Sequence, residues 1–362
     1  MAKIFILACD GGGIRGYITA SVLQKLVAGP AGNFLGKVTL NAGTSTGSFI
    51  SLGLASGLTI DRIQAQYQQA NAAPIFTPNP NISGAEAKRA ALLERLRGSS
   101  GLGGIWDDLL KYIEYFLNAS YTNTGLISVA KALLGPTRTL AALAPVLVNT
   151  LQLDDTAAQP NGWTPLTISN VGTTRYRGML AWEAALCSGA APIYFPPFSP
   201  SSAPLGFCAD GGLFANNPSL AAIASAISQG NLPSDIYVLS LDTGTTADGM
   251  SAGVISGWGG PLDMGPAQWL LPFSQTVGGT TTPKFPLLSA LMDSSSDAIT
   301  QQSAQLLGAN YFRVKVPLVR PVALDDTSNA AYDTMNASLA QYYRSQGYSD
   351  AIRWLTTHIP TL

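Results

Sequence analysis

Three short segments carry residues that could together perform acyl transfer. The first is Gly43-Thr44-Ser45-Thr46-Gly47, which follows a short apolar stretch and precedes a predicted helix. This order is typical of a nucleophile elbow, in which a tight turn presents a serine hydroxyl at the end of a strand. The two glycines suit a turn where side chains would collide with backbone, and a helix N-terminus favours developing negative charge. Ser45 is therefore a candidate nucleophile.

The second segment is the glycine-rich loop Asp10–Gly16, whose consecutive N–H groups could converge on an anion. One candidate is a dinucleotide pyrophosphate, because Gly11, Gly13 and Gly16 match the Gly-x-Gly-x-x-Gly fingerprint. The other is the oxyanion of an acyl-transfer intermediate. A dinucleotide site needs an acidic residue about 20 positions further on, and residues 17–60 contain no Asp or Glu. The oxyanion is favoured, and a nucleotide-binding protein is the alternative from another class.

The third segment, Asp210-Gly211-Gly212, supplies a candidate general base. A carboxylate is a weaker base than imidazole by about two to three pKa units, but burial and a direct hydrogen bond to the serine compensate. The two glycines would let this segment approach the elbow closely. Asp210 is therefore a candidate base that could serve Ser45 directly, without a histidine between them.

A second hydrolase interpretation stays open beside the dyad. The chain has one histidine, His358, and the order Ser45, Asp242, His358 matches the triad order of α/β-hydrolases. Such a protein would be a general carboxylesterase. The substitution His358→Ala separates the two, because the dyad predicts little loss of activity and the triad predicts collapse.

Composition narrows the classes of partner. The chain has 362 residues, a net charge of −1 and only 11% charged residues, against roughly 25% in a typical domain. No run of Lys or Arg occurs, so a nucleic-acid partner is not expected. The three cysteines and single histidine have no spacing typical of a zinc site, so we expect neither a metal nor an organic cofactor. Oligomeric state is left open.

The apolar run at the N-terminus, residues 4–9, is shorter than the apolar core of a secretory signal peptide. The long uncharged stretches are broken by Gly, Ser, Asn or Pro and do not resemble transmembrane helices. We expect a cytoplasmic protein or one that is peripheral to a membrane, with export by another route not excluded.

Apolar periodicity predicts one α/β domain over residues 1–362. The first elements alternate strand, helix, strand, helix, which is typical of a parallel sheet covered by helices. From about 61 to 152 the pattern is mainly helical, and this segment is expected to be an insertion that packs on the sheet or covers a substrate pocket. Its clearest predicted helices are 84–97 and 105–118. The later expected strands are 164–171, 205–209, 235–241 and 310–316.

Together these segments resemble the patatin-like phospholipases. Asp10–Gly16 resembles the family's Asp-Gly-Gly-Gly-x-Arg-Gly loop, and Gly43–Gly47 resembles its elbow. Residues 187–197 resemble its Ala-Ala-Pro-x-Tyr-Phe block, and residues 210–218 its Asp-Gly-Gly…Asn-Asn-Pro block. Residues 239–244 resemble a later strand end, with Asp242 where the family usually has Gly. The resemblance covers about 1–60 and 180–245.

The resemblance implies a three-layer α/β/α sandwich with a mostly parallel central sheet. It also implies hydrolysis of fatty acyl esters by an enzyme of the phospholipase A or lysophospholipase type, through an acyl-enzyme on Ser45 with Asp210 as base. The amides of Gly12 and Gly13, with Thr46 N–H as an addition, would form the oxyanion hole.

Two further positions bear on the lipid partner that the resemblance implies. Arg15 would either steady the glycine loop or meet a lipid phosphate. The stretch 254–273 is expected either to touch a membrane or micelle interface transiently or to pack inside the protein. Its large apolar residues include Trp258, Trp269, Leu270 and Leu271.

Overall fold

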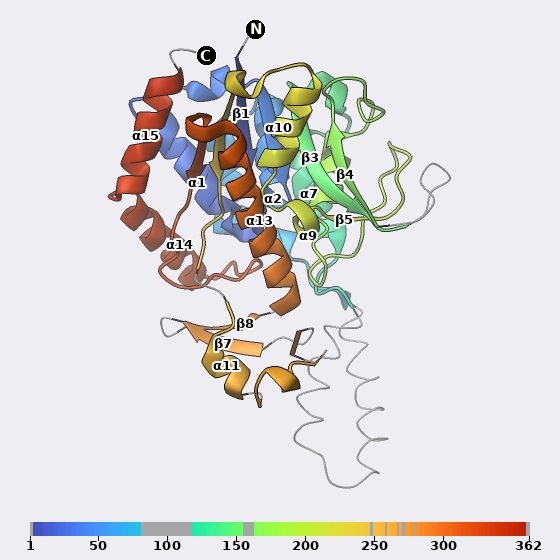
Figure 1. Ribbon diagram of the computed structural model, residues 1–362. Coiled ribbons are helices and arrows are strands. Elements are labelled where there is room, and N and C mark those ends of the chain that lie inside the picture. Colours follow the sequence, from blue (N-terminus) through green and yellow to red (C-terminus); the bar gives the residue numbers. More distant parts are fainter. Residues whose placement is uncertain are drawn as a thin grey trace.

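A mostly parallel sheet of seven strands lies at the centre of the part of the chain that the structure describes (Figure 1). The computed structural model describes residues 3–80, 118–154, 163–246, 249–257, 259–265, 268–269, 273–277, 280–284 and 286–359. The path order is β4-β3-β2-β1-β6-β9, and β5 pairs with β3. The strands are β1 (Ile4–Cys9), β2 (Leu40–Thr44), β3 (Val146–Gln152), β4 (Thr164–Ser169), β5 (Cys208–Asp210), β6 (Ile236–Leu241) and β9 (Tyr311–Val314).

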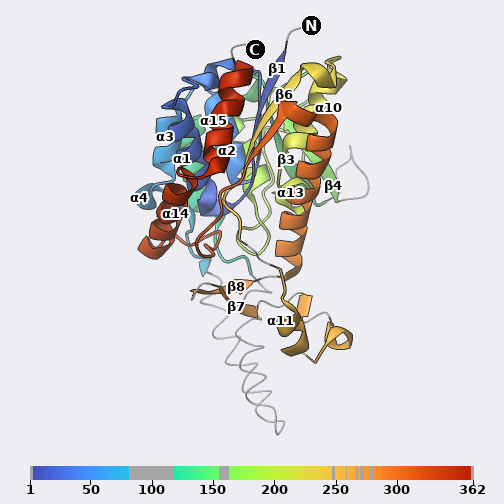
Figure 2. The same cartoon turned by 60° about the vertical axis from the view of Figure 1, so that its left-hand side comes forward.

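Helices cover both faces of this sheet, as Figures 1 and 2 show. On β1, Phe5 and Leu7 pack in a core with α1 (Gly16–Val27), α14 (Asn329–Tyr342) and α15 (Gln346–His358). Ile6 and Ala8 point to the other face and pack with α10 (Ser219–Ser228) and the end of α13 (Pro286–Leu307). Because both faces are buried, the strand is continuously apolar. The expected three-layer α/β/α class is confirmed.

A third core packs against β3, formed by α2 (Thr46–Ala55), α7 (Asn123–Leu134) and α8 (Ala181–Gly189). The shorter elements are α3 (Ile60–Gln66), α4 (Gln69–Ala72), α9 (Gly212–Ala215), α11 (Ala252–Gly257) and the two-stranded sheet β7 (Phe273–Val277) with β8 (Thr280–Lys284). None of the helices in the described ranges is both long and apolar enough to cross a bilayer.

The mainly helical segment predicted at 61–152 ends earlier in the structure than predicted. Its last residues, Val146–Gln152, form β3, which pairs with three other strands. All seven residues of β3 are buried, so the strand lacks the apolar–polar alternation that identifies a half-exposed strand. The expected helices 84–97 and 105–118 fall, apart from residue 118, outside the described residues.

Candidate active site

Ser45 sits in a strained turn between β2 and α2. Its φ is 54° and its ψ is −125°, a backbone conformation that residues other than glycine rarely adopt. A Cβ atom on Gly47 would lie 2.0 Å from the Cys9 carbonyl oxygen, and one on Gly43 would lie 2.3 Å from the Gly47 carbonyl oxygen. Only glycine fits at these two positions, so the local geometry is that of a nucleophile elbow.

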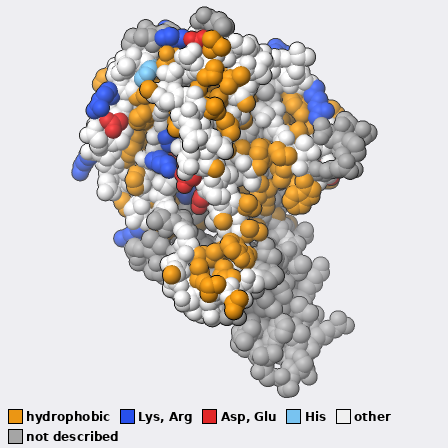
Figure 3. All heavy atoms as spheres, viewed as in Figure 1, with side chains coloured by type: hydrophobic (Ala, Val, Ile, Leu, Met, Phe, Trp, Pro, Cys, Tyr) orange, Lys and Arg blue, Asp and Glu red, His pale blue; other side chains and the backbone are white. Residues whose placement is uncertain are grey.

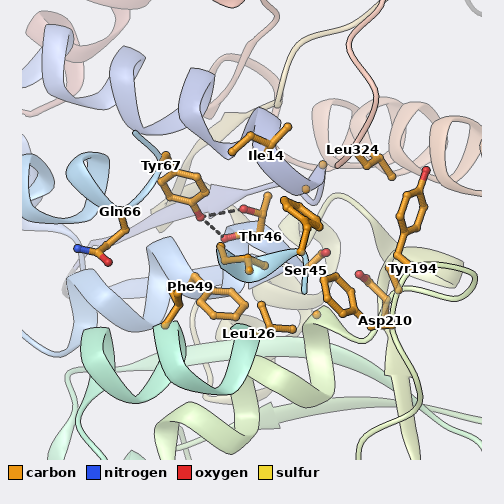
Figure 4. Close-up of a pocket in the computed structure, with 18 of the residues that line it drawn as sticks. Ile14, Ser45, Thr46, Phe49, Gln66, Tyr67, Leu126, Tyr194, Asp210 and Leu324 are labelled. Carbon is orange, nitrogen blue, oxygen red and sulfur yellow. Dashed lines mark hydrogen bonds between the residues drawn. The ribbon is translucent and has the colours of Figure 1, made fainter. Parts of the chain in front are cut away.

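The register of β3 explains how Asp210 reaches Ser45. The last residue of β2, Thr44, pairs with Asn149 of β3. The next residue of β3, Thr150, pairs instead with Asp210, the last residue of β5. β5 therefore takes the position along β3 that β2 vacates when the chain turns away at Ser45. Figure 4 shows the Ser45 hydroxyl and the Asp210 carboxylate facing one another.

The Asp210 carboxyl group is 2% exposed, and burial raises its pKa to about 6. The nearby Ser45 hydroxyl and the Gly212 N–H, which donates to Oδ1 at 2.7 Å, moderate this rise. Oδ2 is buried and has no hydrogen-bond partner of normal geometry among the described residues. Asp210 is thus a carboxylate of raised basicity with one oxygen left to accept a proton.

The glycine loop after β1 offers two free amides beside Ser45. The flanking N–H groups, those of Gly11 and Ile14, donate to backbone carbonyls elsewhere in the fold. Within the described part of the chain, the N–H groups of Gly12 and Gly13 make no hydrogen bond, and both residues line the Ser45 pocket. Thr46 N–H, at the start of α2, is likewise unbonded there. Unbonded N–H groups beside a serine hydroxyl are the kind of donor that an oxyanion hole needs.

Other glycines of the three segments allow the close approach of these elements. A Cβ on Gly11 would lie 2.9 Å from the Cβ of Ser45, and one on Gly16, the first residue of α1, would lie 2.4 Å from Thr46 Oγ1. A Cβ on Gly211 would lie 2.4 Å from a backbone oxygen of β3. A side chain at any of these positions would push the loops apart.

Ser188, at the end of α8, holds the elbow from behind, a role that the sequence did not reveal. Ser45 N–H donates to Ser188 Oγ at 2.9 Å, and the Ser188 hydroxyl donates to the Asn149 carbonyl at 2.7 Å. The residue falls in the 187–197 block that carries part of the resemblance, but only the fold shows which backbone group it bonds. Ser188 therefore links the elbow to the strand that also positions Asp210.

Ser45 and Asp210 open into a largely apolar pocket of about 810 Å³, including the part open to solvent (Figure 4). Among the described residues that line it, Asp210 carries the only charge. No three His, Cys, Asp or Glu side chains in the described ranges are grouped to hold a metal ion. Because its lining is mostly apolar and carries one charge among the described residues, the pocket suits an apolar chain. Its larger apolar side chains include Phe49, Leu126, Val129, Leu133, Tyr194 and Phe195.

Arg15 does not line the Ser45 pocket. Its guanidinium group donates to the carbonyls of Gly12 and Gly244, both at 3.4 Å. The side chain lines a separate polar cavity on the other side of the glycine loop. These contacts are of the kind that would steady the loop, and the role of Arg15 stays a prediction.

The alternative triad is not assembled. His358 lies against Trp354 and Tyr237, with ring centroids 4.7 and 5.4 Å apart. Tyr237 pairs with Phe5 near the amino end of β1, whereas Ser45 follows the carboxyl end of β2. The Asp242 carboxylate accepts backbone N–H groups instead of contacting a histidine. The triad interpretation is wrong because His358 lies near the amino ends of the parallel strands, whereas Ser45 and Asp242 follow their carboxyl ends.

Comparison with known proteins agrees with this fold. Residues 7–223 match the patatin-like phospholipase family model, and the chain belongs to that family. It is 27% identical over 337 residues to the putative sporulation hydrolase CotR of Bacillus subtilis, covering 87% of each chain. It is 26% identical over 309 residues to a cGAMP-activated phospholipase of Pseudomonas aeruginosa, covering 85% of this chain and 77% of that one.

A structural comparison matches VipD from Legionella pneumophila at 12% identity, with a TM-score of 0.47, over 99% of this chain and 67% of that one. Membership of the patatin-like phospholipase family supports a hydrolase that acts on lipid acyl esters.

Proposed function

We propose that this protein is a serine lipid acyl hydrolase of the phospholipase A or lysophospholipase type that uses a Ser45–Asp210 dyad. The observation that supports this most is the buried carboxylate of Asp210, brought to the Ser45 hydroxyl by the register of β3. The apolar pocket that both residues line suits the acyl chain of a lipid. Relatives named as phospholipases agree with a lipid substrate.

In the first step, Asp210 accepts the Ser45 proton while the hydroxyl oxygen attacks the ester carbonyl. The negative charge that develops on the carbonyl oxygen is met by the N–H groups of Gly12 and Gly13, and by that of Thr46 at the start of α2. The tetrahedral intermediate collapses as the alcohol leaves, taking the proton from Asp210. Ser45 then carries the acyl group.

In the second step, water attacks the acyl-enzyme. Asp210 accepts a proton from that water, the oxyanion forms again at the same amides, and Ser45 leaves with the proton. Burial favours this chemistry because it keeps the pKa of Asp210 near 6, well above that of an exposed aspartate. Neither step draws on a metal or an organic cofactor.

The test is hydrolysis of a chain-length series of acyl esters and of phospholipid vesicles by the wild type, Ser45→Ala and Asp210→Asn. We expect both substitutions to lower kcat by at least about 10³-fold, because each removes a group needed for proton transfer and attack. His358→Ala is the matched control and should keep near-full activity. Either dyad variant retaining most of its activity would overturn the proposal.

A further inference from the structure

Asn149 is a polar residue in the middle of β3, and its side chain is fully buried. It pairs with Thr44 of β2 on one side and with Thr167 of β4 on the other. An amide in such a place is unfavourable unless its hydrogen bonds are made. The partners of this side chain therefore indicate what it holds in place.

The side-chain amide of Asn149 makes hydrogen bonds at both its nitrogen and its oxygen. Nδ2 donates to Thr44 Oγ1 at 3.1 Å and to the Ala215 carbonyl at 3.3 Å. Oδ1 accepts from the Thr167 hydroxyl at 3.3 Å. The Thr44 hydroxyl donates to the same Ala215 carbonyl at 2.8 Å. Because a carbonyl only accepts, the amide nitrogen must face Ala215, and this fixes the orientation of the amide.

The two acceptors of the Asn149 amide belong to the two halves of the proposed dyad. Thr44 is the last residue of β2 and directly precedes the proposed nucleophile. Ala215 is the last residue of α9, and Gly212, the first residue of this helix, donates its N–H to Asp210 Oδ1 at 2.7 Å. The position of α9 therefore influences the orientation of the Asp210 carboxylate, and Asn149 ties α9 to the end of β2.

The main chain of Asn149 supports the elbow as well. Its carbonyl accepts the Ser188 hydroxyl at 2.7 Å, and Ser188 Oγ accepts the Ser45 N–H at 2.9 Å. The next residue of β3, Thr150, pairs with Asp210. One short stretch of β3 is thus linked to the backbone of Ser45 and to the helix that orients Asp210.

We propose that Asn149 is a positioning residue that fixes the separation between the Ser45 hydroxyl and the Asp210 carboxylate. This role rests on the proposed function, since it assumes that the two groups exchange a proton. A buried network whose donors all have partners favours one arrangement, and proton transfer needs the two oxygens within hydrogen-bond reach. Loss of the amide weakens the tie between α9 and β2, and a displacement of about 1 Å can lower the rate by roughly 10²-fold.

The experiment measures kcat and KM for a soluble short-chain ester. Asn149→Leu removes both N–H bonds and keeps a side chain of similar size, whereas Thr44→Val removes the shared hydroxyl and alters β2 instead of β3. We expect each substitution to lower kcat by roughly 10- to 100-fold and to leave KM within about threefold, because neither residue lines the pocket. Thr44→Ser keeps the hydroxyl and should recover most of the kcat that Thr44→Val loses.

The pH dependence of kcat/KM is the readout that a purely structural role would not change. The nearby Ser45 hydroxyl lowers the pKa of Asp210, so a longer distance between them should move the fall in kcat/KM at low pH to higher pH. Gln152→Leu is the matched control, because Gln152 is also a buried amide of β3 but donates to the Asp154 carbonyl. It should match the wild type in kcat and in pH dependence. Thermal melts establish that each variant is folded.

Wild-type kcat in the folded Asn149 and Thr44→Val variants, or an equal loss in Gln152→Leu, would overturn the positioning role. A lower kcat with an unchanged pH dependence would also overturn it, because the amide would then support the fold and not the dyad. If Asn149→Leu does not fold, Thr44→Val decides. Activity retained in Ser45→Ala or Asp210→Asn would overturn the proposed function, and with it any dyad to position. Loss in both of these with normal Asn149 and Thr44 variants would overturn the positioning role alone.

Discussion

Burial raises the pKa of Asp210 to about 6, close to the value of about 6.5 for an unperturbed histidine. A carboxylate placed directly against the serine can therefore serve where other hydrolases use an imidazole and its orienting acid. The same burial is unfavourable for the fold, because the ionised form loses solvation that its single hydrogen bond from Gly212 replaces only in part. Burial of Asp210 therefore raises the basicity of the carboxylate and, at the same time, lowers the stability of the folded protein.

The pKa of Asp210 predicts the pH dependence of activity. Only the ionised carboxylate can accept the Ser45 proton, so kcat/KM should rise with pH and level off above about 6. The measurement is kcat/KM for a soluble short-chain ester between about pH 4.5 and 8.5. His358→Ala should leave this acid limb in place. If kcat/KM of the His358 variant no longer fell at low pH, the group that titrates would be His358 and not Asp210.

The same shift predicts that Asp210→Asn makes the protein more stable at neutral pH. The pKa is about 6 in the folded state against 3.8 for an unperturbed aspartate, so the folded protein favours the protonated form. Stability from this group is fully present below the unfolded pKa and is lost as pH rises through about 6. Removing the charge should restore on the order of 3 kcal/mol at pH 7.5 and almost nothing at pH 3.5.

Urea unfolding of the wild type and Asp210→Asn at both pH values measures this difference. The exposed Asp333→Asn is the control and should show little change at either pH. An Asp210 variant less stable than the wild type at pH 7.5 would mean that the carboxylate makes favourable contacts that outweigh its burial.

Two elements position the site and its substrate. Strand β3 places β2 and β5 end to end, so it sets the distance between Ser45 and Asp210. Helix α7 lines the pocket with Leu126, Val129 and Leu133, a spacing that puts all three on one helical face. From the first to the last of these the helix advances about 10 Å. Leu126 packs near Gly189, next to the serine that holds the elbow.

Helix α7 should therefore set the preferred acyl length. Leu133→Trp adds bulk to a buried position at the end of the lined face. It should lower kcat/KM for long-chain esters by roughly tenfold while leaving short-chain esters within about twofold, because only long chains reach it. The measurement is the chain-length series. The exposed Val319→Trp is the control, and an unchanged length profile in a Leu133 variant that still hydrolyses short esters would contradict the role of α7.

The whole molecule carries few charges, with a net charge of −1, and apolar side chains gather on one face over α11 and its surroundings (Figure 3). In the stretch 254–273, Leu262 is fully exposed and Trp269 is 38% exposed. Trp258, Leu270 and Leu271 lie outside the described residues. We infer that this face touches lipid through apolar contacts, since the chain has no basic run to attract an anionic membrane.

Leu262→Asp should reduce sedimentation with neutral phospholipid vesicles by several-fold, because a charge replaces an apolar side chain that would enter the lipid. Hydrolysis of a soluble short-chain ester should not change, since this step needs no interface. Leu232→Asp is the matched control: Leu232 is also exposed, at 51%, but precedes the amino end of β6. Equal losses in both variants, or none in either, would argue against this face.

The sequence by itself determined the local parts of the protein. Gly43–Gly47, the glycine loop and the alternation of strand and helix each depend on neighbouring residues, so turn chemistry and apolar periodicity predicted them. The apolar run at residues 4–9 is observed as β1 (Ile4–Cys9). The interpretation that Ser45 and Asp210 act together came from the family resemblance, because no local pattern connects residues so far apart.

Only the tertiary structure decided how those parts meet. β3 escaped prediction because the buried polar residues Asn149, Thr150 and Gln152 interrupt its apolar run. Its pairing with β2 and β5 nevertheless places Asp210 near Ser45. Packing also put His358 at the other end of the sheet and turned Arg15 into the separate polar cavity. Strand pairing and burial depend on residues distant in the chain, and burial in particular sets the pKa of Asp210. The sequence identifies the candidate side chains, but the distances between them and their exposure to solvent are set only when the helices pack on the sheet.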